Sequence, residues 1–138
     1  MICPECGATD CKARFDECLA LEFSDLRYGA VHNLTVATYM LQHSSQLSRE
    51  GWLYERDLLR EFIVEGKSPS VIRQQVKDSV DSGKRTFKFK SKDSKPVIHK
   101  STWTRTILDV RTDDPKTYCA DVNAWARAVL EDVHGLHP

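Results

Sequence analysis

The 138-residue sequence has no net charge, because its 20 lysines and arginines balance its 20 aspartates and glutamates. The chain as a whole is therefore not attracted electrostatically to nucleic acid or to a membrane surface. No apolar run approaches the length of a transmembrane helix, and no signal-peptide pattern opens the chain. We therefore expect a protein of the reducing cytoplasm with no membrane partner.

The common catalytic and nucleotide-binding motifs are also missing. The sequence contains no nucleophile elbow, no P-loop and no dinucleotide-binding glycine pattern. It has no internal repeat and no low-complexity linker, and at this length a single domain is the default. The sequence thus identifies no substrate and no reaction, and it leaves open whether the protein is an enzyme.

Cysteine, in contrast, is concentrated at the start of the chain. Four of the five cysteines lie within the first 18 residues, at Cys3, Cys6, Cys11 and Cys18. Cys3–Gly7 reads Cys-Pro-Glu-Cys-Gly, in which the glycine permits a tight turn that directs two thiolates at one metal ion. Clustered cysteines in a reducing compartment favour metal or redox chemistry over disulfides. A redox motif of this kind normally follows a β-strand, which is missing here, so we predict a zinc knuckle. We expect the distant Cys119 to be a small buried apolar residue.

Apolar periodicity and capping signals predict a mainly α fold. Helices are expected over residues 11–24, 30–43, 49–65, 69–82 and 115–134. Asp10, or its neighbour Thr9, is the expected N-cap of the first helix. Ser68-Pro69 and Asp114-Pro115 each combine an N-cap side chain with a proline in the first turn, which is typical of a helix start.

We interpret residues 1–138 as one domain, a helical bundle with an N-terminal zinc knuckle and one irregular or short β insertion before the last helix. Its parts are a knuckle at 1–11, a helical core at 11–83, an irregular basic segment at 84–112, and a final helix with its tail at 113–138. Within the irregular segment, residues 86–90 alternate as a short strand does. Residues 103–110 are compatible with either a short helix or an extended chain.

The first two predicted helices are joined by a short loop at residues 25–29, so they should pack antiparallel. In such a hairpin, facing residues have a constant sum of residue numbers. The pairs that follow are Cys11 with His43, Phe15 with Tyr39, Cys18 with Val36, and Glu22 with His32. On each helix these residues are spaced so that they lie on one face.

This pairing predicts the fourth metal ligand. It places His43 at the end of the hairpin where the knuckle lies, so Cys3, Cys6, Cys11 and His43 supply three thiolates and one imidazole. That donor set is the usual one of a closed structural zinc site. Cys18 is the rival fourth ligand, but from a helical Cys11 it lies two turns away, roughly 10 Å along the axis. The alternatives are a set of free or redox-active thiols and, for His43, a helix C-terminal histidine favoured by the helix dipole.

At the other end of the hairpin, Glu22 faces His32. This pair is either an acid–base pair or part of a second metal site, or a hydrogen bond that satisfies two half-buried polar groups. We favour the hydrogen bond. A metal-dependent small-molecule enzyme that uses Glu22 and His32, with Tyr39 or Trp103 lining its cleft, is the first alternative function.

The most basic part of the chain is residues 84–105. They include Lys84, Arg85, Lys88, Lys90, Lys92, Lys95, Lys100 and Arg105 against the single acid Asp93. A zinc knuckle with a basic, aromatic-bearing segment is a common combination in nucleic-acid-binding proteins. The zero net charge argues instead for a solvated loop, so nucleic-acid binding is the second alternative. The leading hypothesis is a binding module with structural zinc, for an unidentified protein or small-molecule partner.

Short motifs spread over most of the chain point to a known family. They are Cys3–Ala8, Cys11, Phe15, Tyr28–His32, Leu34–Val36, Tyr39, Leu41–His43, Trp103–Thr104 and Ala124–Ala126. In these motifs the chain resembles an uncharacterised bacterial family of small proteins headed by Cys-Pro-x-Cys-Gly. In that family a proline follows the second histidine, whereas this chain has Ser44, and Cys18 is peculiar to this member. The resemblance supports His43 over Cys18 as ligand, and it implies a shared fold and site but no reaction.

Overall fold

The computed structural model describes residues 2–81, 95–98, 100 and 102–138. Its helices are α1 (Cys11–Ser24), α2 (Leu26–Gly29), α3 (His32–Gln42), η1 (Ser44–Gln46), α4 (Arg49–Ile63), α5 (Pro69–Asp81), η2 (Ile107–Asp109) and α6 (Pro115–Asp132). Here η denotes a short 3-10 helix. Among the described residues the only β pairing is an isolated bridge between Ile2 and Thr9. The predicted mainly helical fold is confirmed, whereas the strand predicted at 86–90 lies outside the described residues.

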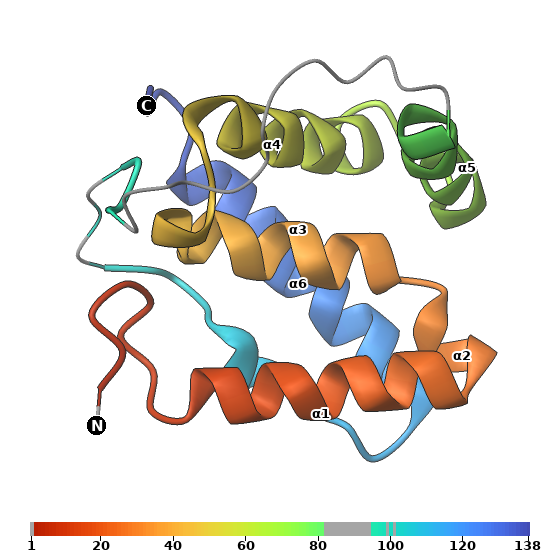
Figure 1. The fold of residues 1–138 in the computed structure, drawn as a ribbon. Helices are drawn as coiled ribbons and strands as arrows, with labels where there is room; N and C mark the ends of the chain where they lie inside the picture. Colours follow the sequence, from red (N-terminus) through yellow and green to blue (C-terminus); the bar gives the residue numbers. More distant parts are fainter. Residues whose placement is uncertain (1, 82–94, 99, 101) are drawn as a thin grey trace.

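Helix α3 lies at the centre of the molecule. It packs against α4 and α6, and it also contacts α1 and α5. Figure 1 shows α1 and α3 running side by side in opposite directions, with the N-terminal knuckle beyond the start of α1, near the end of α3. The antiparallel hairpin predicted from the sequence therefore forms. No described helix has both the length and the apolar character needed to cross a membrane.

Capping residues explain where three of the helices begin. The Ser48 side chain accepts a hydrogen bond from the Gly51 N–H, and Asp114 accepts one from the Thr117 N–H. Ser68 does the same for the Val71 N–H at the start of α5. The side-chain cap expected from Asp10 at the start of α1 does not form. Asp10 occupies the N-cap position in the left-handed region, at φ 55°, and its side chain makes no capping hydrogen bond.

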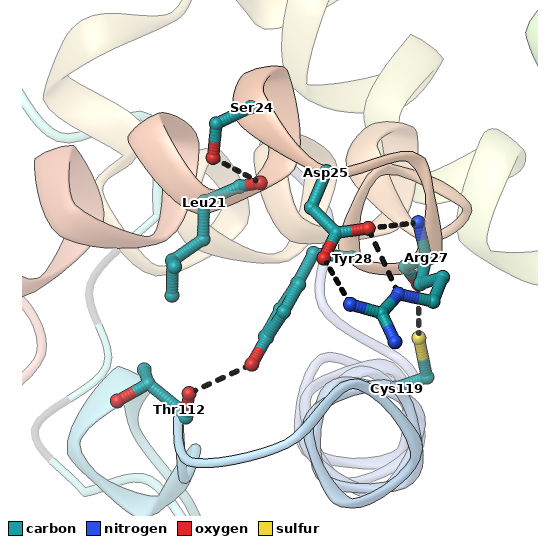
Figure 2. Close-up of polar contacts among 7 residues, drawn as sticks. All are labelled: Leu21, Ser24, Asp25, Arg27, Tyr28, Thr112 and Cys119. Atoms are coloured by element: carbon teal, nitrogen blue, oxygen red, sulfur yellow. Dashed lines mark hydrogen bonds and ion pairs between the residues drawn. The ribbon is translucent and has the colours of Figure 1, made fainter.

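The connection between α1 and α3 is a short helix, α2, where the sequence suggested a loop. The Asp25 carboxylate accepts a hydrogen bond from the Arg27 N–H and pairs with the Arg27 guanidinium (Figure 2). The Tyr28 hydroxyl donates to the Thr112 carbonyl at 3.0 Å. The Cys119 thiol lies 3.3 Å from the Arg27 carbonyl and is only half-buried, so Cys119 is not the buried apolar residue we expected. Both contacts tie the turn of the hairpin to the part of the chain around the start of α6.

The core is centred on large side chains of α3, α4 and α6. Trp52, Tyr118 and Trp125 are fully buried. The Trp125 indole N–H donates to the Gln42 side-chain carbonyl at 3.0 Å, and the Gln42 amide donates to the Arg105 carbonyl at 2.7 Å. These two bonds fix the end of α3 against both α6 and the chain that leads into η2. The end of α3 also carries one of the predicted metal ligands.

Candidate metal centre

The four predicted ligands meet at one end of the α1–α3 hairpin. The ligand atoms of Cys3, Cys6, Cys11 and His43 all lie within 4.8 Å of one another, a spacing that fits one shared metal ion. In the described part of the chain no other group of three or more such side chains was found. Cys18 is fully buried on α1 but does not belong to this group. The geometry therefore agrees with His43, and not Cys18, as the fourth ligand.

A tight turn brings Cys3 and Cys6 together. The Gly7 N–H donates to the Cys3 carbonyl at 2.9 Å, and the Cys3 N–H donates to the Ala8 carbonyl at 2.9 Å. Gly7 has a φ of 81°, in the left-handed region that favours glycine. The Ala8 N–H also points at the Cys6 sulfur, 3.5 Å away. This is the turn that the Cys-Pro-Glu-Cys-Gly motif predicts, with one N–H placed to stabilise a thiolate.

His43 follows directly after α3, and its ring is held in one tautomer. Its Nδ1 lies 2.7 Å from the Tyr39 carbonyl oxygen, which can only accept, so Nδ1 carries the proton. The Nε2 lone pair consequently faces the Cys11 sulfur, 3.5 Å away. Burial lowers the pKa of His43, which keeps the ring neutral and able to bind a metal. An imidazole oriented by its second nitrogen is typical of metal-binding histidines.

An aromatic stack joins this ligand to the interface between α1 and α3. The Phe15 and Tyr39 rings are 3.9 Å apart between centroids and nearly parallel, at 5°. Tyr39 stacks on His43 in turn, with centroids 3.9 Å apart. Two of the predicted facing pairs, Phe15 with Tyr39 and Cys11 with His43, are therefore confirmed as contacts. Aromatic packing between α1 and α3 thus contributes to the register of the hairpin.

Burial opposes the ionisation of two of the three thiols. Burial, with a contribution from neighbouring Cys11, raises the pKa of Cys6 to about 12. Burial also raises the pKa of Cys11. Burial acts in the same direction on Cys3, but hydrogen bonds involving the backbone of Cys6 and Glu5 outweigh it and lower the pKa of Cys3. A divalent cation would reverse the first two shifts, because it stabilises the thiolates that burial penalises.

Residues far away in the sequence hold the knuckle in place. The Glu5 carboxylate accepts hydrogen bonds from the Ser45 N–H at 2.9 Å and from the Ser45 hydroxyl at 2.7 Å. The Trp103 indole N–H donates to the Glu5 backbone carbonyl at 2.8 Å. Our sequence reasoning did not predict these contacts, because no periodic spacing relates residues 40 or 98 positions apart.

The opposite end of the hairpin contains a buried carboxylate. Glu22 is 2.7 Å from His32 Nδ1, and its other oxygen accepts hydrogen bonds from the hydroxyls of Thr35 and Tyr118. The Glu22 side chain has no exposed area, whereas the His32 side chain is 30% exposed. Burial, followed by the bond to Glu22, raises the pKa of Tyr118, so its hydroxyl stays a donor. The predicted hydrogen bond is confirmed, while Thr35 and Tyr118 were missed.

Two other sequence-based expectations need correction or stay open. Tyr39 and Trp103 do not line a cleft with Glu22 and His32, because they contact His43 and Glu5 at the metal end. Of the eight basic residues between 84 and 105, five lie outside the described residues, so the nucleic-acid hypothesis stays a prediction. The described ones are Lys95, Lys100 and Arg105.

Comparison with known proteins gives one match. The model of a family described as "Family of unknown function (DUF5946)" matches residues 1–134, which is nearly the whole chain. No curated protein and no solved structure matches it. Any statement of function therefore depends on the chemistry of the site.

Proposed function

The chain belongs to the DUF5946 family of unknown function, and we propose that it is a binding module held together by one structural zinc ion. Cys3, Cys6, Cys11 and His43 are the proposed ligands. The observation that carries the proposal is the convergence of three thiols with an imidazole whose Nδ1 proton is already committed to a carbonyl. Such a set supplies four donors of the type that zinc prefers.

The donor count supports a structural role over a catalytic one. Four protein ligands complete a tetrahedral zinc site, whereas a catalytic zinc keeps one position for water or substrate. Cys6, Cys11 and His43 are each less than 10% exposed, which leaves little access for a substrate. Zinc here would join the knuckle to the start of α1 and to the end of α3, so its binding energy contributes to folding.

All five cysteines are free thiols in the structure, which suits a reducing compartment such as the cytoplasm. In an oxidising compartment the same thiols would be exposed to disulfide formation. We therefore propose a cytoplasmic location together with the zinc site. The binding role is proposed for the surface that the knuckle completes, where Glu5, Ser45 and Trp103 join three separate parts of the chain.

Metal content per chain, measured by elemental mass spectrometry on untagged protein, tests the proposal. We expect one zinc per chain, with most of it lost in His43→Ala and retained in Cys18→Ala. His32→Ala is the matched control, because it removes the histidine at the start of α3, at the other end of the hairpin. Zinc lost with Cys18 and kept without His43 would show that the ligand set is wrong.

A second candidate function is proton transfer at His32. The ring is oriented by Glu22 through Nδ1, and Nε2 has no hydrogen-bond partner among the described residues. An imidazole held in this way, in a side chain that is 30% exposed, can act as a general acid or base. Hydrolase and transferase screens with wild type and His32→Ala test it. An activity lost in His32→Ala, at unchanged zinc content and stability, would favour this function.

A further inference from the structure

A surface cavity of about 390 Å³ lies beside the candidate metal centre. Its walls include Glu5 of the knuckle, Leu41 and Ser44 around the end of α3, and Ile98, Lys100 and Trp103 from the chain before η2. Its size falls within the range of small-molecule sites, about 300–1,000 Å³. Glu5 lies between the ligands Cys3 and Cys6, so one wall of the cavity exists only while the knuckle is folded.

The polar groups of this cavity are nearly all occupied. Both Glu5 oxygens accept hydrogen bonds from Ser45. The Trp103 N–H is bonded to the Glu5 carbonyl. The Ser44 hydroxyl lies within hydrogen-bond distance of the Val97 N–H and of the Ile98 backbone. Hydrogen bonds inside the protein therefore already engage each of these groups.

Lys100 is the exception. Its ammonium lies over the Trp103 ring, 5.6 Å from the centroid. Among the described residues no carboxylate forms an ion pair with it, although Glu5 lines the same cavity. Lys100 is thus the one cation among the described residues that line the cavity, and it lies beside Ile98 and the Trp103 indole.

We propose that this cavity binds a small organic anion, whose carboxylate or similar group pairs with Lys100 while its apolar body packs against Trp103 and Ile98. The inference rests on the proposed function, because the zinc knuckle supplies the Glu5 wall. An anion fits better than a cation, because a cationic ligand would be repelled by Lys100 and would compete with it for the indole face.

The three tryptophans provide a direct test. Trp52 and Trp125 have no exposed area, whereas Trp103 is partly buried at the cavity. The indole N–H signals of the zinc-loaded full chain can be followed by NMR, with Trp103→Phe identifying the Trp103 signal. Phenylacetate, phenethylamine and 2-phenylethanol serve as probes of the same shape with negative, positive and no charge. We expect a saturable shift of the Trp103 signal with phenylacetate, and much smaller shifts of the other two signals.

Two lysine variants test how much the positive charge of Lys100 contributes to binding. Lys100→Met should weaken phenylacetate binding about tenfold, because a charged hydrogen-bonding partner is lost. Lys95→Met removes an exposed cation that does not line the cavity, so it should leave binding unchanged. 2-Phenylethanol should bind about tenfold more weakly than phenylacetate in wild type and should not discriminate between the two variants.

Several results would overturn the inference. They are no saturable shift up to about 10 mM phenylacetate, phenethylamine binding as tightly as phenylacetate, or equal binding to wild type and Lys100→Met. Zinc content and thermal unfolding are measured on the same samples. A chain with one zinc but no phenylacetate binding would contradict the anion site alone, whereas a chain without zinc would contradict the proposed function.

Discussion

Each end of the α1–α3 hairpin holds a cluster of polar side chains, but the two clusters differ in whether their polar atoms already have partners. At the knuckle end, Cys3, Cys6, Cys11 and His43 direct metal-ligating atoms at one point. At the other end, the two oxygens of Glu22 accept three hydrogen bonds from the protein itself. The first cluster has the donors to hold a metal ion, whereas the polar groups of the second already bond one another. Buried polar residues therefore indicate a binding site only where their hydrogen-bonding and charge requirements are left unmet.

The pKa of Cys6 and the number of hydrogen-bond donors around Glu22 show the same difference between the two ends. Burial and a neighbouring thiol raise the pKa of Cys6 to about 12, which favours the protonated thiol in the absence of a metal ion. Glu22 already receives Tyr118 and Thr35 hydroxyls together with His32. A buried carboxylate with this many donors is stabilised in place and has little capacity left for a metal ion.

Removal of the metal should give the largest change in stability, and this change should arise at the knuckle end alone. A strong chelator should lower the free energy of unfolding by an amount on the order of 4–5 kcal/mol, because the knuckle loses its attachment to α1 and α3. Calorimetry with and without chelator measures this change. The Cys6→Ser variant should be destabilised to a similar degree and should respond little to chelator. Equal chelator sensitivity in Cys6→Ser and wild type would mean that the stabilising metal is bound elsewhere.

Tyr118→Phe should have a smaller effect, confined to the other end. It removes one donor from the buried Glu22 carboxylate and keeps the aromatic ring, at a cost of about 2 kcal/mol. Denaturant unfolding measures the loss, and zinc content should not change. Tyr28→Phe is the matched control, because its hydroxyl bonds a backbone carbonyl, and not a buried charge, and should cost about 1 kcal/mol. Loss of zinc in Tyr118→Phe would show that the two ends are coupled.

Most of the helical framework and the grouping of the four candidate ligands could be predicted from the sequence, because they follow from local periodicity and from the Cys-Pro-Glu-Cys-Gly motif. The helix at 11–24 agrees with α1, and the antiparallel register correctly placed Cys11 against His43 and Glu22 against His32. The contact of Cys18 with Val36 stays a prediction. The short connection was expected to be a loop, but the side chain of Asp25 caps a turn of helix there.

What could not be predicted depends on tertiary contacts. Tyr118 reaches Glu22 from α6, and Trp103 reaches Glu5 from the chain before η2, in both cases across more than 90 positions. No local spacing encodes such pairs, because they depend on how helices cross. The same holds for the cavity beside the knuckle, whose walls come from three parts of the chain.

The smallest expected effect compares one glycine from each end of the hairpin. Gly7 has a φ of 81° and open space around it, so Gly7→Ala should cost about 1 kcal/mol through backbone strain alone. A Cβ on Gly29 would lie 2.7 Å from the Glu22 carbonyl oxygen, so Gly29→Ala should cost about 1–2 kcal/mol by pushing α2 away from α1. Denaturant unfolding of both variants, with and without chelator, checks these values.

Because the strain at Gly7 acts on the knuckle, its cost should disappear once the metal is removed, whereas the cost at Gly29 should persist. A cost at Gly7 that persists after chelation would mean that the turn keeps its shape without metal, and that the knuckle is held mainly by Ser45 and Trp103.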